Sequence, residues 1–229
     1  MTTIAANLQA VRSRIEAAAL RAERRPDCVR LVAVSKTFPA DSVRAAHAAG
    51  QRAFGENHEQ EGAAKIAALH DLALEWHFIG PIQSNKTRSI AAHFDWVHSI
   101  DRLKIAQRLA EARPADRSPL GVLVQVNVSG EATKSGVAPA EVGALARAVA
   151  ALPRLSLRGL MAIPLPTPDP ELQRRQFRTL RELRDGLERD GLSLPELSMG
   201  MSADLESAVM EGATLVRVGS AIFGDRPAG

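Results

Sequence analysis

The sequence predicts a single (β/α)8 TIM-type barrel with an extra helix at its N-terminus. Three observations lead to this prediction. Eight short apolar runs rich in β-branched residues recur along the chain, amphipathic stretches of helical period lie between them, and one further helical stretch precedes the first run. Alternating strands and helices form parallel sheets, and eight such units close into a barrel of about this length.

The N-terminal segment is expected to be the extra helix, and it lacks the apolar region of a secretory signal. Its apolar residues follow at spacings of three and four: Ile4, Leu8, Val11, Ile15 and Ala18. The candidate strands are residues 29–35, 52–55, 75–80, 95–100, 121–128, 155–163, 196–200 and 214–219. Helices are expected between them, for example at 40–49, 103–112, 140–152 and 171–189. Gly50 and Gly212 stand where two helices would stop before the next strand.

An open, doubly wound sheet is the alternative architecture. Such folds bind dinucleotides through a glycine-rich loop after the first strand. Here the first strand is followed by Lys36-Thr37-Phe38-Pro39, which is not such a loop. Hydrophobic residues make up 45% of the chain, and no linker or shift in composition divides it. We therefore expect one domain over residues 1–229.

Composition also argues against two kinds of partner, nucleic acids and membranes. The net charge is only +3, the basic residues are spread along the helices, and aromatic residues are 3% of the chain, so we expect no nucleic-acid partner. No apolar run approaches the ~20 residues that a membrane span needs, so we expect no membrane contact. The single cysteine, Cys28, excludes an internal disulfide and suits a reducing compartment. We expect a cytoplasmic protein.

Only five of the 29 basic residues are lysines, so each lysine is a candidate for a specific role. Active sites of such barrels lie at the C-terminal ends of the strands. Lys36 directly follows the first run, and Lys86 and Lys134 fall in loops after later strands. A partly buried Lys36 would keep more uncharged amine to attack a carbonyl, and the alternative is a solvated strand-end lysine. Lys65 and Lys104 fall within predicted helices and are interpreted as solvated surface residues.

The ends of the last two strands, in GMSADLE and RVGSAIFG, predict a phosphate site. Ser202 and the pair Gly219-Ser220 precede helix-prone stretches, where hydroxyls and free amides can bind an anion, although Ser202 could instead be a helix N-cap. A lysine facing such a site suits a phosphorylated aldehyde, such as pyridoxal phosphate or an aldolase substrate. Arg217 could then meet the ring nitrogen of pyridoxal phosphate, or it could pair with a carboxylate such as Glu56.

Several sequence blocks resemble those of one known family. The stretch WHFIGPIQSNK at 76–86 is similar to that family's most distinctive signature. LVAVSKT, FGENHEQE, NVSGEATKSG, LSMGMSADLESAV and VRVGSAIFG resemble further blocks in the family's order. The chain thus resembles the pyridoxal phosphate homeostasis proteins, also called the proline synthase co-transcribed family, over nearly its whole length. His58 stands where a tyrosine is common, and Ser220 where a threonine is common.

The resemblance implies a barrel like the N-terminal domain of alanine racemase, without a second domain. It implies that the chain holds pyridoxal 5'-phosphate (PLP) as a Schiff base on Lys36, with Asn57 lining the cofactor pocket. Ser202, Gly219 and Ser220 would hold the phosphate, and Arg217 would lie near the pyridine nitrogen. It further implies a monomeric carrier of PLP in vitamin B6 homeostasis, with PLP-dependent apo-enzymes as candidate recipients.

A PLP-dependent amino-acid racemase or related enzyme is the alternative function, and a Schiff-base aldolase is a third. Alanine racemases use a tyrosine from the partner's other domain as the second acid/base, whereas this chain contains no tyrosine. An arginine at the pyridine nitrogen also disfavours ring protonation and so weakens the ring as an electron sink. His77 or Lys134 could serve as a base, although each also fits a structural role. We predict a carrier without appreciable catalysis.

Overall fold

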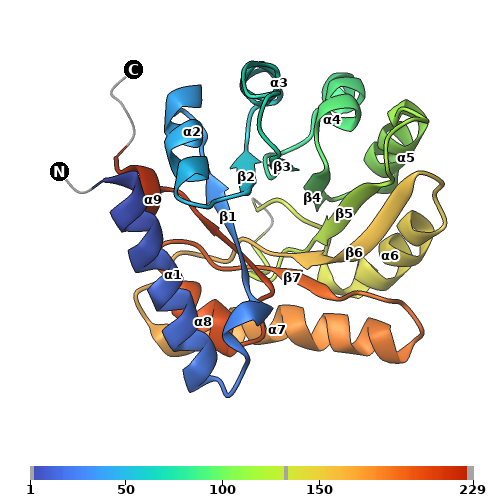
Figure 1. Ribbon diagram of the computed structural model, residues 1–229. Coiled ribbons are helices and arrows are strands. Elements are labelled where there is room, and N and C mark those ends of the chain that lie inside the picture. Colours follow the sequence, from blue (N-terminus) through green and yellow to red (C-terminus); the bar gives the residue numbers. More distant parts are fainter. Residues whose placement is uncertain (1–2, 132–133, 226–229) are drawn as a thin grey trace.

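The computed structural model describes residues 3–131 and 134–225, and the strands of this part of the chain close into one parallel barrel (Figure 1). The strands are β1 Arg30–Val34, β2 Ala53–Glu56, β3 Glu75–Phe78, β4 Trp96–Ile100, β5 Leu120–Gln125, β6 Leu155–Met161, β7 Glu196–Ser198 and β8 Leu215–Val218. Each strand pairs with the next along the chain, and β8 pairs back onto β1. The prediction of a (β/α)8 barrel is confirmed.

Helices surround this barrel. They are α1 Ile4–Arg21, α2 Ala40–Ala48, α3 Glu59–Ala68, α4 Thr87–His93, α5 Leu103–Ala112, α6 Val142–Ala150, α7 Pro170–Arg189, α8 Leu205–Met210 and α9 Ser220–Phe223. Short 3-10 turns precede β1, α4 and α6 at Pro26–Cys28, Ser84–Lys86 and Pro139–Glu141. The extra N-terminal helix is therefore confirmed as α1, and Gly50 and Gly212 adopt positive φ of 86° and 99° just after α2 and α8.

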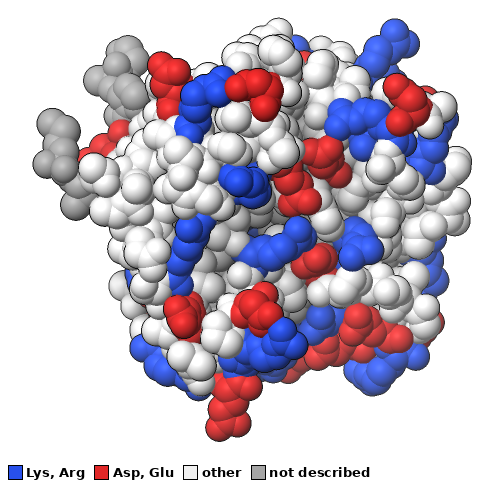
Figure 2. All heavy atoms as spheres, in the orientation of Figure 1, with Lys and Arg blue, Asp and Glu red and all other residues white. Residues whose placement is uncertain are grey.

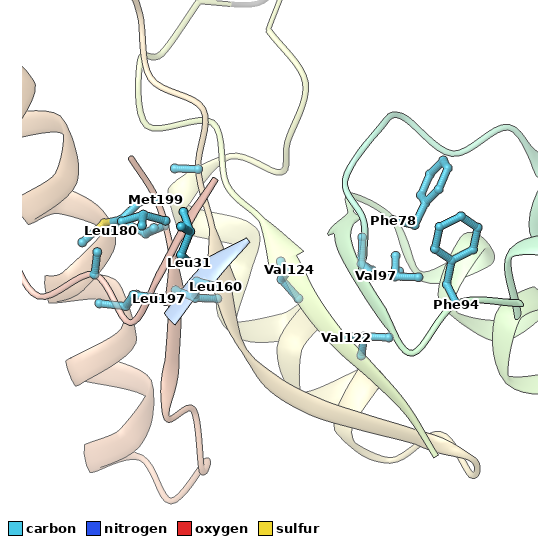
Figure 3. Close-up of a cluster of buried hydrophobic side chains, with 14 of the residues drawn as sticks. Leu31, Phe78, Phe94, Val97, Val122, Val124, Leu160, Leu180, Leu197 and Met199 are labelled. Carbon is cyan, nitrogen blue, oxygen red and sulfur yellow. The ribbon is translucent and has the colours of Figure 1, made fainter. Parts of the chain in front are cut away.

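The hydrophobic core lies mainly between the barrel and its helices. Phe78 and Phe94 pack edge to face with ring centroids 5.3 Å apart, close to Val97 on β4 (Figure 3). Alternation along a strand places neighbours on opposite faces. Leu31 belongs to this outer cluster, whereas Val32 packs inside the barrel in a small cluster with Leu123, Met161 and Leu215.

Helix α1 runs beside α8 and α9, the two helices that follow the last strands (Figure 1). Arg14 donates to both carboxylate oxygens of Glu206 at 2.7 and 2.9 Å, and to the carbonyl of Ser202 at 3.0 Å. Asn7 donates to the carbonyl of Ile222 at 2.9 Å. The N-terminal helix thereby supports the loop after β7 and helix α9 after β8.

The burial of one lysine differs from the expectation from sequence. Lys104 is exposed, as predicted, but Lys65 is buried and ion-paired, so its interpretation as a solvated residue was wrong. The physical reason is that Glu56, at the end of β2, offers a buried carboxylate within reach of α3. On the face that Figure 2 shows, basic and acidic side chains are interspersed. None of the described helices is long and apolar enough to cross a membrane.

A buried carboxylate fixes α7 to the end of α8. Glu211 is 1% exposed and accepts hydrogen bonds from three arginines on one face of α7: Arg174, Arg178 and Arg181. Burial alone would raise the pKa of Glu211, but the hydrogen bonds from Arg178 and Arg174 outweigh it and hold that pKa below its ordinary value. The ion cluster therefore stabilises the fold while Glu211 is ionised.

Glu211→Ala is expected to lower the free energy of unfolding by about 2 kcal/mol at neutral pH, because hydrogen bonds to a charged group are lost. Chemical denaturation measures this. The deficit should shrink as the pH falls below 4.5, because protonation of Glu211 in the parent chain removes the same stabilisation. Asp71→Ala, which removes an exposed pair with Arg44, is the control and should change little. Equal effects of both substitutions would contradict this prediction.

Candidate functional site

A pocket of about 410 Å³ opens at the C-terminal ends of β1, β2, β7 and β8. Apolar side chains such as Ile79, Ile163 and Met201 form part of its wall. The six residues that the sequence predicted as a cofactor site all line it: Lys36, Asn57, Ser202, Arg217, Gly219 and Ser220. Strands far apart in sequence supply them, so barrel closure brings them together.

Lys36 reaches the pocket from a tight turn that follows β1. The amide of Phe38 donates to the carbonyl of Ser35 at 3.1 Å, which closes the turn over Lys36 and Thr37. Thr37 adopts φ of 70°, as the third residue of a type II turn must. The lysine therefore occupies the second position of a defined turn at the end of β1.

Two serines face each other across the loops after β7 and β8. The hydroxyl oxygens of Ser202 and Ser220 lie 3.2 Å apart. Ser202 is not the N-cap of α8, because Asp204 occupies that position and its carboxylate accepts the amide of Met201 at 2.6 Å. A Cβ on Gly219 would lie 3.1 Å from the carbonyl oxygen of Val34, so a glycine gives the closest fit of this loop to β1.

Arg217 is 3% exposed on β8 beneath these loops. It donates to the hydroxyl of Ser198 at 2.6 Å and to the carbonyl of Ala162 at 2.9 Å. Burial lowers the pKa of Arg217 to about 10, partly offset by the charge of Asp204, so the side chain remains a cation at neutral pH. The alternative ion pair with Glu56 is not formed, because Glu56 is bound by Ser35 and Lys65.

A chain of hydrogen bonds continues from Arg217 through the barrel interior. Ser198 Oγ lies 2.8 Å from His98 Nδ1, and His98 Nε2 lies 2.9 Å from His77 Nδ1. His77 Nε2 ends the chain 2.8 Å from Glu75 at the start of β3. Burial lowers the pKa of both imidazoles, so they are neutral. Of the two roles that the sequence left open for His77, these contacts favour the structural one, and sequence reasoning missed Ser198 and His98.

Asn57 follows β2 and carries an unsatisfied acceptor. Its Oδ1 is buried without a hydrogen-bond partner among the described residues. A Cβ on Gly80 would lie 2.1 Å from the carbonyl oxygen of Asn57, so only glycine lets the loop after β3 approach this closely. Ser99 holds that loop by donating to the carbonyl of Gly80 at 2.5 Å. A buried acceptor without a partner is a position that a ligand donor would fill.

The remaining lysines at strand ends lie elsewhere. Lys86 pairs with Glu59 at 3.2 Å and lines a neighbouring pocket of about 380 Å³, which shares Asn57 with the first. Lys134 is exposed in the loop after β5, and residues 132–133 of the NVSGEATKSG block lie outside the described part of the chain. Within residues 3–131 and 134–225, no group of three or more His, Cys, Asp or Glu could hold a metal ion.

Comparisons with known proteins identify the family and agree with the barrel fold. Residues 6–227 match the family described as alanine racemase, N-terminal domain. The chain is 62% identical over its whole length to the pyridoxal phosphate homeostasis protein of Pseudomonas aeruginosa, of which it covers 98%.

Solved structures extend the comparison. PipY of Synechococcus elongatus, solved with PLP bound, is 41% identical, with a TM-score of 0.82 over 93% of this chain and all of that one. Alanine racemase from Corynebacterium glutamicum shares the fold at 20% identity, with a TM-score of 0.69 over 97% of this chain and 63% of that one. The chain belongs to the family of pyridoxal phosphate homeostasis proteins, which share the fold of the alanine racemase N-terminal domain.

Proposed function

We propose that this chain binds PLP in the pocket of about 410 Å³, linked covalently to Lys36, and acts as a carrier of the cofactor in vitamin B6 homeostasis. The observation that carries the proposal is the convergence of all six predicted residues on one pocket. The relatives support it, because the P. aeruginosa relative is named for pyridoxal phosphate homeostasis and PipY was solved with PLP. We further propose that the chain is a cytoplasmic, monomeric, single-domain protein.

The described residues fit the chemical groups of PLP. The hydroxyls of Ser202 and Ser220, beside Gly219, suit a phosphate, because both can donate hydrogen bonds to its oxygens. Lys36 lines the same pocket and supplies an amine for the aldehyde. Asn57 offers its unsatisfied Oδ1 to a donor group of the ligand.

When bound, PLP supplies an aldehyde that condenses with amines and a ring that can accept electrons from an amino-acid substrate. Arg217 would weaken the ability of the ring to accept electrons. It is a buried cation, and guanidinium groups only donate hydrogen bonds, so an adjacent ring nitrogen would accept a bond and stay unprotonated. An unprotonated ring is the weaker electron sink, which favours holding the cofactor over reacting with it.

Racemase activity is the second candidate, because the fold is that of the alanine racemase N-terminal domain. Racemisation needs a second acid/base beside the lysine, and the chain contains no tyrosine. His77 is buried between His98 and Glu75 and does not line the pocket, and Lys134 is exposed. These positions favour the carrier function.

Lys36 is expected to carry the cofactor. Borohydride reduction of the PLP-loaded protein should fix the label to the peptide that contains Lys36, as mass spectrometry can show. Lys36→Ala should abolish the visible absorption of lysine-bound PLP. Label found only on the peptides of Lys86 or Lys134 would contradict this assignment.

Ser202→Ala and Ser220→Ala should each weaken PLP binding by about 1.5–3 kcal/mol, because a hydrogen bond to a charged group is lost. Titration followed by absorbance measures this. Affinity for unphosphorylated pyridoxal should hardly change, and Ser13→Ala, at an exposed serine on α1, is the control. Equal losses for PLP and pyridoxal would argue against a phosphate site at these serines.

The PLP-loaded protein is expected to do little or no amino-acid chemistry. Incubation with alanine in deuterated water, followed by measurement of α-proton exchange and enantiomer ratio, tests this directly. Turnover of about 1 s⁻¹ or faster, the ordinary range for enzymes, would show that the chain is a racemase or a related enzyme.

A further inference from the structure

We propose that Lys65, Glu61 and Glu56, here called the Lys65 cluster, are positioning residues that hold the turn presenting Lys36 to the pocket. This inference rests on the proposed function, since it assigns the cluster a role in the link between Lys36 and PLP. The three side chains come from α3 and the end of β2, and they contact the chain on both sides of Lys36.

Lys65 is the centre of the cluster. Its ammonium nitrogen lies 2.7 Å from the carbonyl oxygen of Ser35, 2.8 Å from Glu56 Oε1 and 2.7 Å from Glu61 Oε1. An ammonium group has three N–H donors, so these three acceptors satisfy it completely. The Lys65 side chain is 7% exposed, and it fixes the residue that precedes Lys36.

Glu61 fixes the residue that follows Lys36. Its Oε1 accepts the amide of Thr37 at 2.6 Å in addition to Lys65. Thr37 has φ of 70°, a conformation that costs free energy for a β-branched residue and usually belongs to glycine. The charge-assisted hydrogen bond that the Thr37 amide donates to Glu61 offsets that cost, because it forms only when this amide points toward α3.

Glu56 completes the cluster from β2. It is fully buried and accepts the Ser35 hydroxyl at 2.6 Å, and burial raises its pKa despite Lys65. Buried ion pairs contribute little net stability relative to apolar packing, so stability alone does not account for this one. Glu56 thus binds Ser35 directly, and it is linked to Thr37 through Lys65 and Glu61. Ser35 and Thr37 are the two neighbours of Lys36.

Glu61→Ala tests the inference, because Glu61 is the most exposed member and its loss leaves the Glu56–Lys65 pair in place. The affinity for PLP should fall about tenfold or more, the effect of losing a hydrogen bond to a charged group. The affinity for pyridoxine 5'-phosphate, which has an alcohol in place of the aldehyde, should stay unchanged. Asp71→Ala, at the exposed pair just after α3, is the control for both ligands.

Adding Thr37→Gly to Glu61→Ala should recover part of the lost affinity, since glycine adopts positive φ without cost. Equal losses for PLP and pyridoxine 5'-phosphate would mean that the cluster only supports the fold, and would overturn the inference. If borohydride labels Lys36 in the parent chain and Glu61→Ala binds PLP with unchanged affinity, the inference is also overturned.

If borohydride does not label Lys36 in the parent chain, the proposed function itself fails, and the inference fails with it.

Discussion

Parallel pairing of β1 with β8 is the constraint on which the rest of the structure depends. The register sets Val32 beside Arg217 and Ala33 beside Val218, so the end of the first strand meets the end of the last. Residues almost 200 positions apart therefore share one pocket wall, and Gly219 lets the loop after β8 lie close against Val34. An open sheet with β1 and β8 at opposite edges would separate the lysine from the serines.

Buried cations, both inside the barrel and under its helices, are held by neutral groups or fully paired. Arg217 meets a hydroxyl and a carbonyl, and the neutral imidazoles of His98 and His77 carry the hydrogen-bond chain onward to Glu75. Lys65 has two carboxylates and a carbonyl. Among the described residues no carboxylate forms an ion pair with Arg217, and this cation lines the pocket.

Local patterns in the sequence were sufficient for the barrel, for α1 and for the residues at the strand ends, because strand ends of a parallel barrel converge on one face. They were insufficient where the partner of a side chain comes from another element of the fold. A lysine in the middle of a polar helix indicates an exposed residue, and only the packing of α3 against β2 gives Lys65 its buried partner Glu56. Likewise, Ser198 and His98 stand 100 residues apart and meet only inside the closed barrel.

Helix α1 lies outside the repeating strand–helix pattern, yet Arg14 and Asn7 tie it to the segments after both β7 and β8. Local opening of a helix is an equilibrium of its own, and any ligand that binds only the closed state shifts it by mass action. A phosphate bound between Ser202 and Ser220 would thus be thermodynamically linked to α1. Any opening of α1 that disturbs these two serines would therefore be less frequent in the ligand-bound protein than in the free one, by a factor set by the ligand concentration and its affinity.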